Sequence, residues 1–245
     1  MAGHSKWANI KHRKARQDEK KAKVYTKLIR EITIAAKSGG PIPEDNPRLR
    51  LALDKANGEN MPKDTINRAI QRGAGNDDNA NLEEVVYEGY GPSGVAILVE
   101  TMTDNRNRTV ADVRHAFTKH GGNLGTDGSV AYLFEKIGSI QLKTDLQEEE
   151  LLELVIEAGA DDLIYSNSMA EVNCSANLLH EVHDALKKKG LDVEFAQIMM
   201  KPTTMIQADQ ELAEKVLKLL DFLEDIDDVQ EVYSNVEFPE NFFEE

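Results

Sequence analysis

Apolar residues recur at helical spacing in three segments between residues 24 and 73. The first segment ends before Gly39-Gly40, and its apolar face is Val24, Leu28, Ile29, Ile32, Ala35 and Ala36. The second follows Asn46 and Pro47, an N-cap and a first helical residue, and carries Leu49, Ala52, Leu53 and Ala56. The third starts near Pro62, has Gly73 just past its end, and buries Ile66, Ala69 and Ile70. These patterns predict a three-helix domain over residues 24–79, ending in a polar linker.

Beyond residue 80 the pattern alternates between strand and helix. Residues 85–90 and 94–101 are predicted to form a hairpin, a helix follows Asn105 or Asn107, and residues 129–134 are predicted as another strand. The next segments, with the order β-α-β-β-α-β, are residues 137–142, 146–158, 163–165, 170–174, 176–188 and 193–200. That order is typical of a ferredoxin-like domain, here residues 135–203.

A helix at residues 210–223 and a strand at residues 229–236 remain, and they are too few to form a domain alone. Added to residues 80–134, they complete a second ferredoxin-like unit, a discontinuous domain of residues 80–134 plus 204–245. A weak similarity between residues 161–167 and 227–235 supports this arrangement. The alternative is two unrelated α+β pieces. We therefore predict an α+β fold, with an N-terminal three-helix domain and basic arm followed by two ferredoxin-like domains, the second inserted in the first.

The distribution of charge changes the functional interpretation. The 245 residues have a formal net charge of −15, which taken whole argues against binding a polyanion. Residues 1–75, however, hold 17 Lys/Arg and 8 Asp/Glu, a net charge of +9. Residues 76–245 hold 12 and 36, a net charge of −24. A basic N-terminal part joined to an acidic remainder is itself a functional signal.

Composition excludes several classes of protein. At 40% hydrophobic and 30% charged residues, the chain has a globular composition. Its one cysteine, Cys174, excludes an internal disulfide and a thiolate metal cluster and fits a reducing compartment. The longest aliphatic run, residues 95–99, is too short to cross a membrane, and the N-terminus does not resemble a secretory signal. We expect a cytoplasmic protein without membrane partners.

The strongest candidate for nucleic-acid binding is the basic arm, residues 1–23. It has almost no apolar face, and its candidate phosphate contacts are Lys6, Lys11, His12, Arg13, Lys14, Arg16, Lys20, Lys21 and Lys23. Trp7 fits stacking on an unpaired base or packing that anchors the arm. The alternative interpretation of the whole arm is a solvated tail.

Two further groups of polar residues suit nucleic acid. The second and third helices have the outline of a helix-turn-helix, and the outward face of the third is Lys63, Asn67, Arg68, Gln71 and Arg72. An ordinary helical hairpin has the same outline. Arg106 and Arg108 begin a helix, where they suit phosphate capture or pairing with nearby acidic groups.

Signals of catalysis or metal binding are weak. His180 and His183 lack a third ligand, and Asp225, Asp227 and Asp228 lack the spacing of a calcium loop. The glycine-rich residues 121–129 follow a helix and precede a strand, the reverse of a phosphate-binding loop. We predict no catalytic residue, no metal site and no cofactor.

Five motifs resemble the YebC/PmpR family. They are residues 2–14 (AGHSKWANIKHRK), 46–50 (NPRLR), 87–92 (YEGYGP), 104–109 (DNRNRT) and 121–134 (GGNLGTDGSVAYLF). The resemblance implies three domains, no established enzymatic activity, and a bacterial transcriptional regulator that binds promoter DNA. It also adds Arg48 and Arg50, within the second motif, to the candidate nucleic-acid contacts.

Three functional hypotheses follow. The first is a non-enzymatic regulator that binds DNA. The second is a ribosome-associated translation factor that binds ribosomal RNA and eases synthesis of proline-rich stretches; the resemblance implies this too, because relatives include a mitochondrial translational activator of cytochrome c oxidase subunit one. The third, a cation- or nucleotide-binding enzyme, has the least support.

Overall fold

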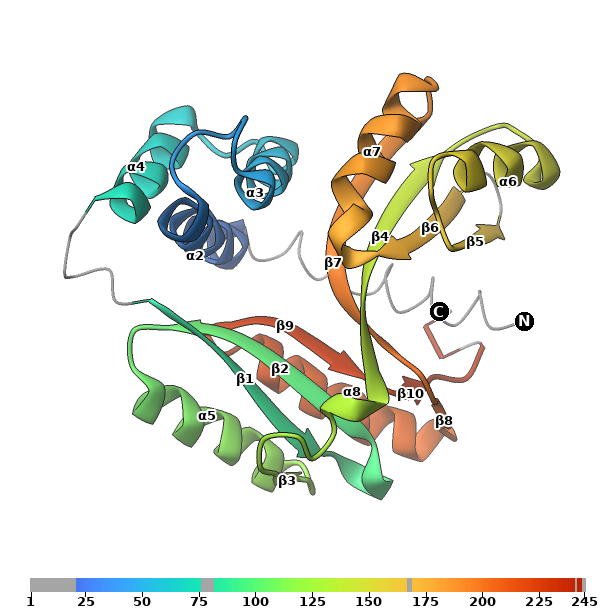
Figure 1. The fold of residues 1–245 in the computed structure, drawn as a ribbon. Helices are drawn as coiled ribbons and strands as arrows, with labels where there is room; N and C mark the ends of the chain where they lie inside the picture. The colour runs from blue at the N-terminus through green and yellow to red at the C-terminus, as the bar shows by residue number, and fades with distance from the viewer. Residues whose placement is uncertain (1–20, 76–81, 167–168, 241, 244–245) are drawn as a thin grey trace. The chain divides into compact units, whose positions relative to one another are not determined.

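The N-terminal helices form as their apolar patterns predict. The computed structural model describes residues 21–75, 82–166, 169–240 and 242–243 (Figure 1). Helices α2 (Lys21–Gly39), α3 (Pro47–Gly58) and α4 (Lys63–Ala74) share a core whose buried members include Ile32, Ala35, Leu49, Ala56 and Ala69. Asn46 caps α3 by accepting from Leu49 N at 3.0 Å, and its Nδ2 donates to Ala35 O at 2.7 Å, which ties the cap to α2.

Gly73 corrects the predicted end of the third helix. The helix continues to Ala74, and Gly73 is a buried helical residue with no terminating role. A Cβ at this position would collide with the carbonyl oxygen of Thr33 and lie 2.9 Å from Ala36 Cβ, both on α2. The glycine is therefore there for close packing between α2 and α4.

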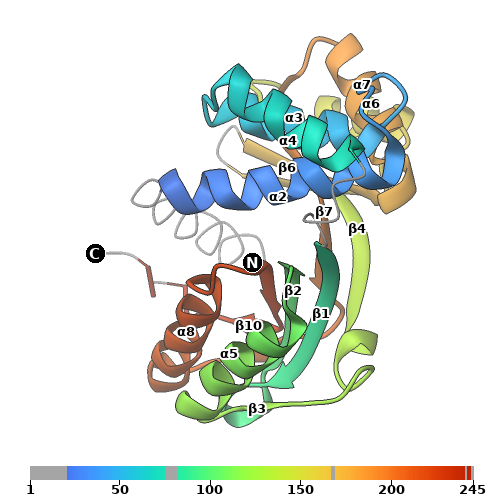
Figure 2. The ribbon, with the colours of Figure 1, turned by 90° about the vertical axis from the view of Figure 1, so that its left-hand side faces the viewer.

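The first sheet joins distant parts of the chain. Its strands are β1 (Glu83–Tyr90), β2 (Ala96–Thr103), β3 (Asn123–Leu124) and β9 (Val229–Ser234), in the order β3-β1-β2-β9. All three neighbouring pairs are antiparallel. Helices α5 (Arg106–Lys119) and α8 (Gln210–Glu224) cover one face of this sheet (Figure 2). The core between them includes Ile97, Val99, Phe117, Val216 and Leu219. A short parallel pair, β8 (Ile206–Gln207) with β10 (Val236–Glu237), flanks α8 and β9 in sequence.

The predicted strand at residues 129–134 is wrong. The structure has a 3-10 turn, η2 (Ala131–Leu133), and strand β4 (Phe134–Lys143) begins where the expected strand ends. The backbone N–H groups of Gly128, Val130 and Ala131 donate to the Glu88 carboxylate, so they are not available to a strand ladder. The edge position of the sheet is taken by β3.

The second sheet has the predicted β-α-β-β-α-β order. Its elements are β4, α6 (Glu148–Glu157), β5 (Asp162–Ser166), β6 (Met169–Ser175), η3 (Ala176–Leu178), α7 (Leu179–Lys188) and β7 (Asp192–Pro202). The strand order is β5-β6-β4-β7. Leu151 and Val155 of α6 and Leu186 of α7 are fully or almost fully buried, as are Ile140 and Val172 of the sheet.

The described chain divides into two compact units. One is Phe134–Lys201, and the other is built from residues on both sides of it. The α+β class with a helical N-terminal region is confirmed. The further separation of the helical region from the first sheet as a domain of its own stays a prediction. Among the described helices, none combines the length and the apolar character that crossing a bilayer requires.

Candidate nucleic-acid interface

The outward face of α4 carries the predicted polar residues together. Lys63, Asn67, Arg68, Gln71 and Arg72 are all exposed, while Ile66, Ala69 and Gly73 face the core. The Arg68 guanidinium donates within its own helix, to Asp64 O at 3.2 Å and Thr65 Oγ1 at 3.4 Å. The side chains of Lys63 and Arg72 make no hydrogen bond or ion pair with any other described residue. This α4 face therefore presents cations that no carboxylate of the described chain neutralises.

Arg48, by contrast, is held by two carboxylates. Its Nε lies 2.7 Å from Glu31 Oε1, and its Nη2 lies 2.6 Å from Glu84 Oε1. Burial alone would lower the pKa of Arg48, but the hydrogen bonds to Glu84 and Glu31 raise it above its ordinary value. Arg50 donates to the carbonyl oxygens of Pro43 and Glu44, which ties it to the turn before α3. Both arginines have structural partners in the free protein.

The arginines at the start of α5 differ from one another. Arg106 is 62% exposed and lies 3.6 Å from Glu83 Oε2, a loose surface contact. Arg108 is bound to Asp104 Oδ1 at 2.8 Å and to Asp228 Oδ2 at 2.7 Å. The sequence allowed two functions for this pair, pairing with acidic groups or capture of a phosphate. Arg108 pairs with acidic groups, whereas the exposed Arg106 is placed where a phosphate could reach it.

Asp228 is the centre of a buried polar cluster. Its side chain is 3% exposed, and its oxygens receive Arg30 at 2.9 Å, Arg108 at 2.7 Å and the Thr109 hydroxyl at 2.7 Å. Burial alone would raise the pKa of Asp228, but the hydrogen bonds from Arg108 and Thr109 and the positive charges of Arg30 and Arg108 lower it. The Asp228 carboxylate, which lies in the acidic sequence of residues 225–228, is therefore paired with two arginines.

Two cations on α2, Lys27 and Arg30, were missed by sequence reasoning. Lys27 Nζ donates to Gln230 O at 3.2 Å, and Arg30 Nη1 donates to Met102 O at 3.1 Å. Both follow Lys23 at helical spacing, so the repeat 23-27-30 was a signal available in the sequence. Their hydrogen-bond partners could not be predicted from this repeat, because those partners are far away along the chain.

The glycine-rich loop binds an anion of the protein itself. The Glu88 carboxylate of β1 accepts from the N–H groups of Gly128, Val130 and Ala131, each at 2.7 Å. Burial alone would raise the pKa of Glu88, and these three bonds lower it. A loop whose glycines resembled a phosphate cradle therefore folds around a carboxylate, and its N–H groups are already satisfied.

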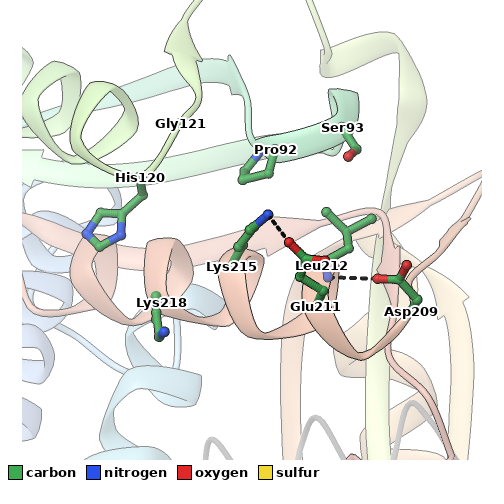
Figure 3. Close-up of a pocket in the computed structure, with 9 residues that line it drawn as sticks. All are labelled: Pro92, Ser93, His120, Gly121, Asp209, Glu211, Leu212, Lys215 and Lys218. Carbon is green, nitrogen blue, oxygen red and sulfur yellow. Dashed lines mark hydrogen bonds and ion pairs between the residues drawn. The ribbon is translucent and has the colours of Figure 1, made fainter.

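A cavity of about 670 Å³ lies between the turn η1 (Pro92–Gly94), the end of α5 and the start of α8 (Figure 3). Lys215 is paired with Glu211 at 2.6 Å, and Asp209 caps α8 through Leu212 N at 2.8 Å. Burial, with the charges of Lys119, His115 and Lys218, lowers the pKa of His120. Because charges of both signs line this cavity, it attracts a polyanion less than the α4 face does.

His183 and Cys174, two of the residues considered for enzyme chemistry, are buried in the structure. The His183 side chain is 9% exposed and lies 3.1 Å from Asp184, on the same helix. Cys174 is buried, and burial raises the pKa of its thiol to about 11, so it is protonated at neutral pH. Within the described ranges, no group of three or more His, Cys, Asp or Glu residues is placed to hold a metal ion.

Eight predicted contact residues lie outside the described residues: Lys6, Trp7, Lys11, His12, Arg13, Lys14, Arg16 and Lys20. Lys21 opens α2, and Lys23 is bound to Asp225. Of the predicted set within the described chain, the structure brings together only the α4 residues as one exposed, cationic face. The role of the whole set in binding stays a prediction.

Comparison with known proteins covers nearly the whole chain. Residues 5–76 match the model of the TACO1/YebC protein N-terminal domain, and residues 82–236 match that of the TACO1/YebC second and third domain. A protein of Hahella chejuensis is 60% identical over 245 residues, covering 100% of this chain and 98% of its own. A protein of Pseudomonas putida is also 60% identical over 245 residues, and the match covers 100% of this chain and 99% of that protein. Both are named probable transcriptional regulatory protein.

One solved structure is similar along most of the molecule. It is the crystal structure of a conserved hypothetical protein from Aquifex aeolicus, with a TM-score of 0.84 and 50% sequence identity. The similarity covers 91% of this chain and 92% of that one.

Proposed function

The chain belongs to the TACO1/YebC family, and from this we propose that it is a non-enzymatic regulatory protein that acts by binding DNA. Its relatives are named probable transcriptional regulatory proteins, which supports regulation as the general activity. We place the contact with DNA on the basic N-terminal part, comprising the arm of residues 1–23 and the α4 face.

The observation that carries this proposal is the unneutralised α4 face. In a chain with 44 acidic and 29 basic residues, carboxylates are abundant enough to pair with many of the cations. Arg48 and Arg108 are paired in this way, whereas Lys63 and Arg72 project from α4 without a carboxylate partner in the described chain. Cations of this kind release counterions when they meet phosphates, which favours binding.

The acidic remainder of the chain restricts where DNA lies. Residues 76–245 carry a net charge of −24, so a phosphate backbone is repelled from most of their surface. DNA binding then depends strongly on the salt concentration and on a small number of Lys and Arg side chains. The arm contributes the most, because Lys11, Arg13, Lys14 and Arg16 lie within six residues of sequence.

A matched pair of variants tests this assignment. Lys63→Gln combined with Arg72→Gln removes two cations from the α4 face. Lys136→Gln combined with Lys143→Gln removes two exposed cations from the unit Phe134–Lys201. Affinity for a duplex DNA is measured by fluorescence anisotropy over a series of salt concentrations. We expect the α4 variant to bind roughly tenfold more weakly, with the salt slope reduced by about two, and the control to bind as the unchanged protein does.

Equal affinity of the two variants would contradict a role for the α4 face. A quadruple change of Lys11, Arg13, Lys14 and Arg16 to alanine addresses the arm in the same assay, and undiminished binding there would reject the proposal as a whole. The same variants tested on ribosomal RNA and on intact ribosomes decide between DNA and the ribosome as partner.

A further inference from the structure

Three cations form a stripe along one side of α2. Lys23, Lys27 and Arg30 are spaced by four and three residues, so their side chains project from the same face of the helix. All three contact the segment that joins α8 to β9 or the first residues of β9. We call them the α2 cation stripe, and we call residues 225–228 the acidic turn.

The contacts run in order along the stripe. Lys23 Nζ donates to Asp225 O at 2.7 Å and lies 3.3 Å from Asp225 Oδ1. Lys27 Nζ donates to Gln230 O at 3.2 Å. Arg30 Nη1 donates to Asp227 O at 2.5 Å and pairs with Asp228 Oδ1 at 2.9 Å. Every acceptor is a carbonyl or carboxylate oxygen, a kind of group that a phosphate oxygen replaces without a change of donor.

The two ends of the stripe differ in their exposure to water. Lys23 and Asp225 have side chains 37% and 47% exposed, so water and salt screen their attraction. Arg30 and Asp228 are 18% and 3% exposed, and separating them would leave a buried charge without a partner. The Lys23 end is therefore easily exchanged, and the Arg30 end is fixed.

We propose that the exposed end of the α2 cation stripe, at Lys23, is a phosphate-binding position which Asp225 of the acidic turn occupies in the free protein. A nucleic-acid strand held by the arm displaces Asp225 from Lys23, and the buried Arg30–Asp228 pair stays in place. This inference rests on the proposed function, because it assumes that the arm holds nucleic acid.

The position of the stripe in the sequence supports this assignment. Helix α2 begins at Lys21, within the last residues of the predicted arm, so Lys23 belongs both to the arm and to the stripe, and a nucleic-acid strand held by the arm extends onto it. The acidic turn, with three aspartates in four residues, opposes that strand. The nucleic acid must then either displace the acidic turn from Lys23 or end before it reaches Lys23. In both cases the negative charge of the turn lowers the affinity.

A double-mutant cycle tests the competition. Asp225→Asn removes the competing charge, and Lys23→Gln removes the site for which the two anions compete. Asp112→Asn is the control, because it removes one negative charge from an exposed position on α5. Affinity is measured with the duplex DNA used above, at low salt, after circular dichroism has shown that each variant is folded.

We expect Asp225→Asn to bind about twofold to fivefold more tightly than the unchanged protein, in line with the strength of an exposed ion pair. Asp112→Asn should change the affinity by less than that, because it tests net charge alone. In the Lys23→Gln background, Asp225→Asn should give no gain, since the site of competition is gone.

An equal gain from Asp225→Asn with and without Lys23 would overturn the inference, and so would no gain at all in a protein that binds DNA. Either result leaves the proposed function standing. Failure of the unchanged protein to bind nucleic acid overturns both.

Discussion

Glu88 shows how one residue determines the structure of a loop. Three backbone N–H groups of residues 128–131 donate to its carboxylate, and Gly125 N donates to its backbone carbonyl oxygen at 2.7 Å. Because the side chain is buried, water does not replace these bonds. The loop that leads from the first sheet to β4 therefore depends on the negative charge of Glu88.

Replacing Glu88 by glutamine should lower the free energy of unfolding by about 2–3 kcal/mol at neutral pH, because an amide N–H₂ then faces the N–H donors. The lowered pKa of Glu88 defines the pH dependence. Its contribution is fully present above the ordinary value of 4.5 and is lost as pH falls through the folded-state pKa below it.

Urea unfolding of both proteins between about pH 3 and pH 7 measures this difference. The two stabilities should converge at the acidic end of the range. Glu135→Gln, at an exposed position of β4, should change stability by no more than about 0.5 kcal/mol. A difference between the Glu88 variant and the unchanged protein that stays constant down to the lowest pH would show that the carboxylate is not the group responsible.

At the scale of elements, helices α2 and α4 pack closely against each other. The contact depends on Gly73, whose missing side chain lets α4 approach the backbone of α2 at Thr33. The approach sets the position of α4 in the bundle, and so it sets where Lys63 and Arg72 project. A residue on the buried side thereby supports the exposed face.

Gly73→Ala should destabilise the helical region by roughly 1–3 kcal/mol, although alanine favours a helix more than glycine does. Gly58→Ala is the matched control, because a Cβ there meets nothing within 4 Å and its backbone is helical. That change should be neutral or stabilise the protein by up to about 1 kcal/mol. Thermal unfolding followed by circular dichroism compares the two, and equal stabilities would refute the packing role of Gly73.

At the scale of the whole molecule, the first sheet needs segments from both sides of the unit Phe134–Lys201. Strand β9 pairs with β2, and α8 supplies Val216, Leu219 and Leu223 to the core shared with α5. The unit Phe134–Lys201 lies between these two contributions in sequence. The elements before residue 134 therefore cannot complete their sheet and core until α8 and β9 have been made.

A chain ending at Pro202 should not form the complete first sheet, because β2 would lose one of its two neighbouring strands, β9, and α5 would lose the helix packed beside it. A chain ending at Phe238 keeps α8 and β9 and should form it. Limited proteolysis with mass spectrometry measures protection of residues 83–124 in both. Equal protection in the two chains would show that the sheet folds without its C-terminal strand.

The amino-acid sequence by itself determined the helices, most of the strands and the separation of charge. These features depend on neighbours a few residues apart: apolar spacing, the N-cap Asn46, and the sign of clustered charges. Of the two caps that the sequence allowed for the helix after residue 105, Asn105 and Asn107, the structure uses Asn105. The strand predicted at residues 129–134 was wrong, and so was the end of the third helix at Gly73. In each case a partner distant in sequence, Glu88 or Thr33, outweighed the local pattern.

Only the tertiary structure decided which cations are neutralised. Arg48, Arg108 and Arg72 are the same residue type, yet the first two meet carboxylates and the third does not. Arg108 and Asp228 are 120 residues apart, and no local pattern predicts their contact. An ion pair forms where the fold brings two charges within a few ångströms, because water and salt screen charges that are farther apart. The charge available to a nucleic acid is therefore a property of the folded chain.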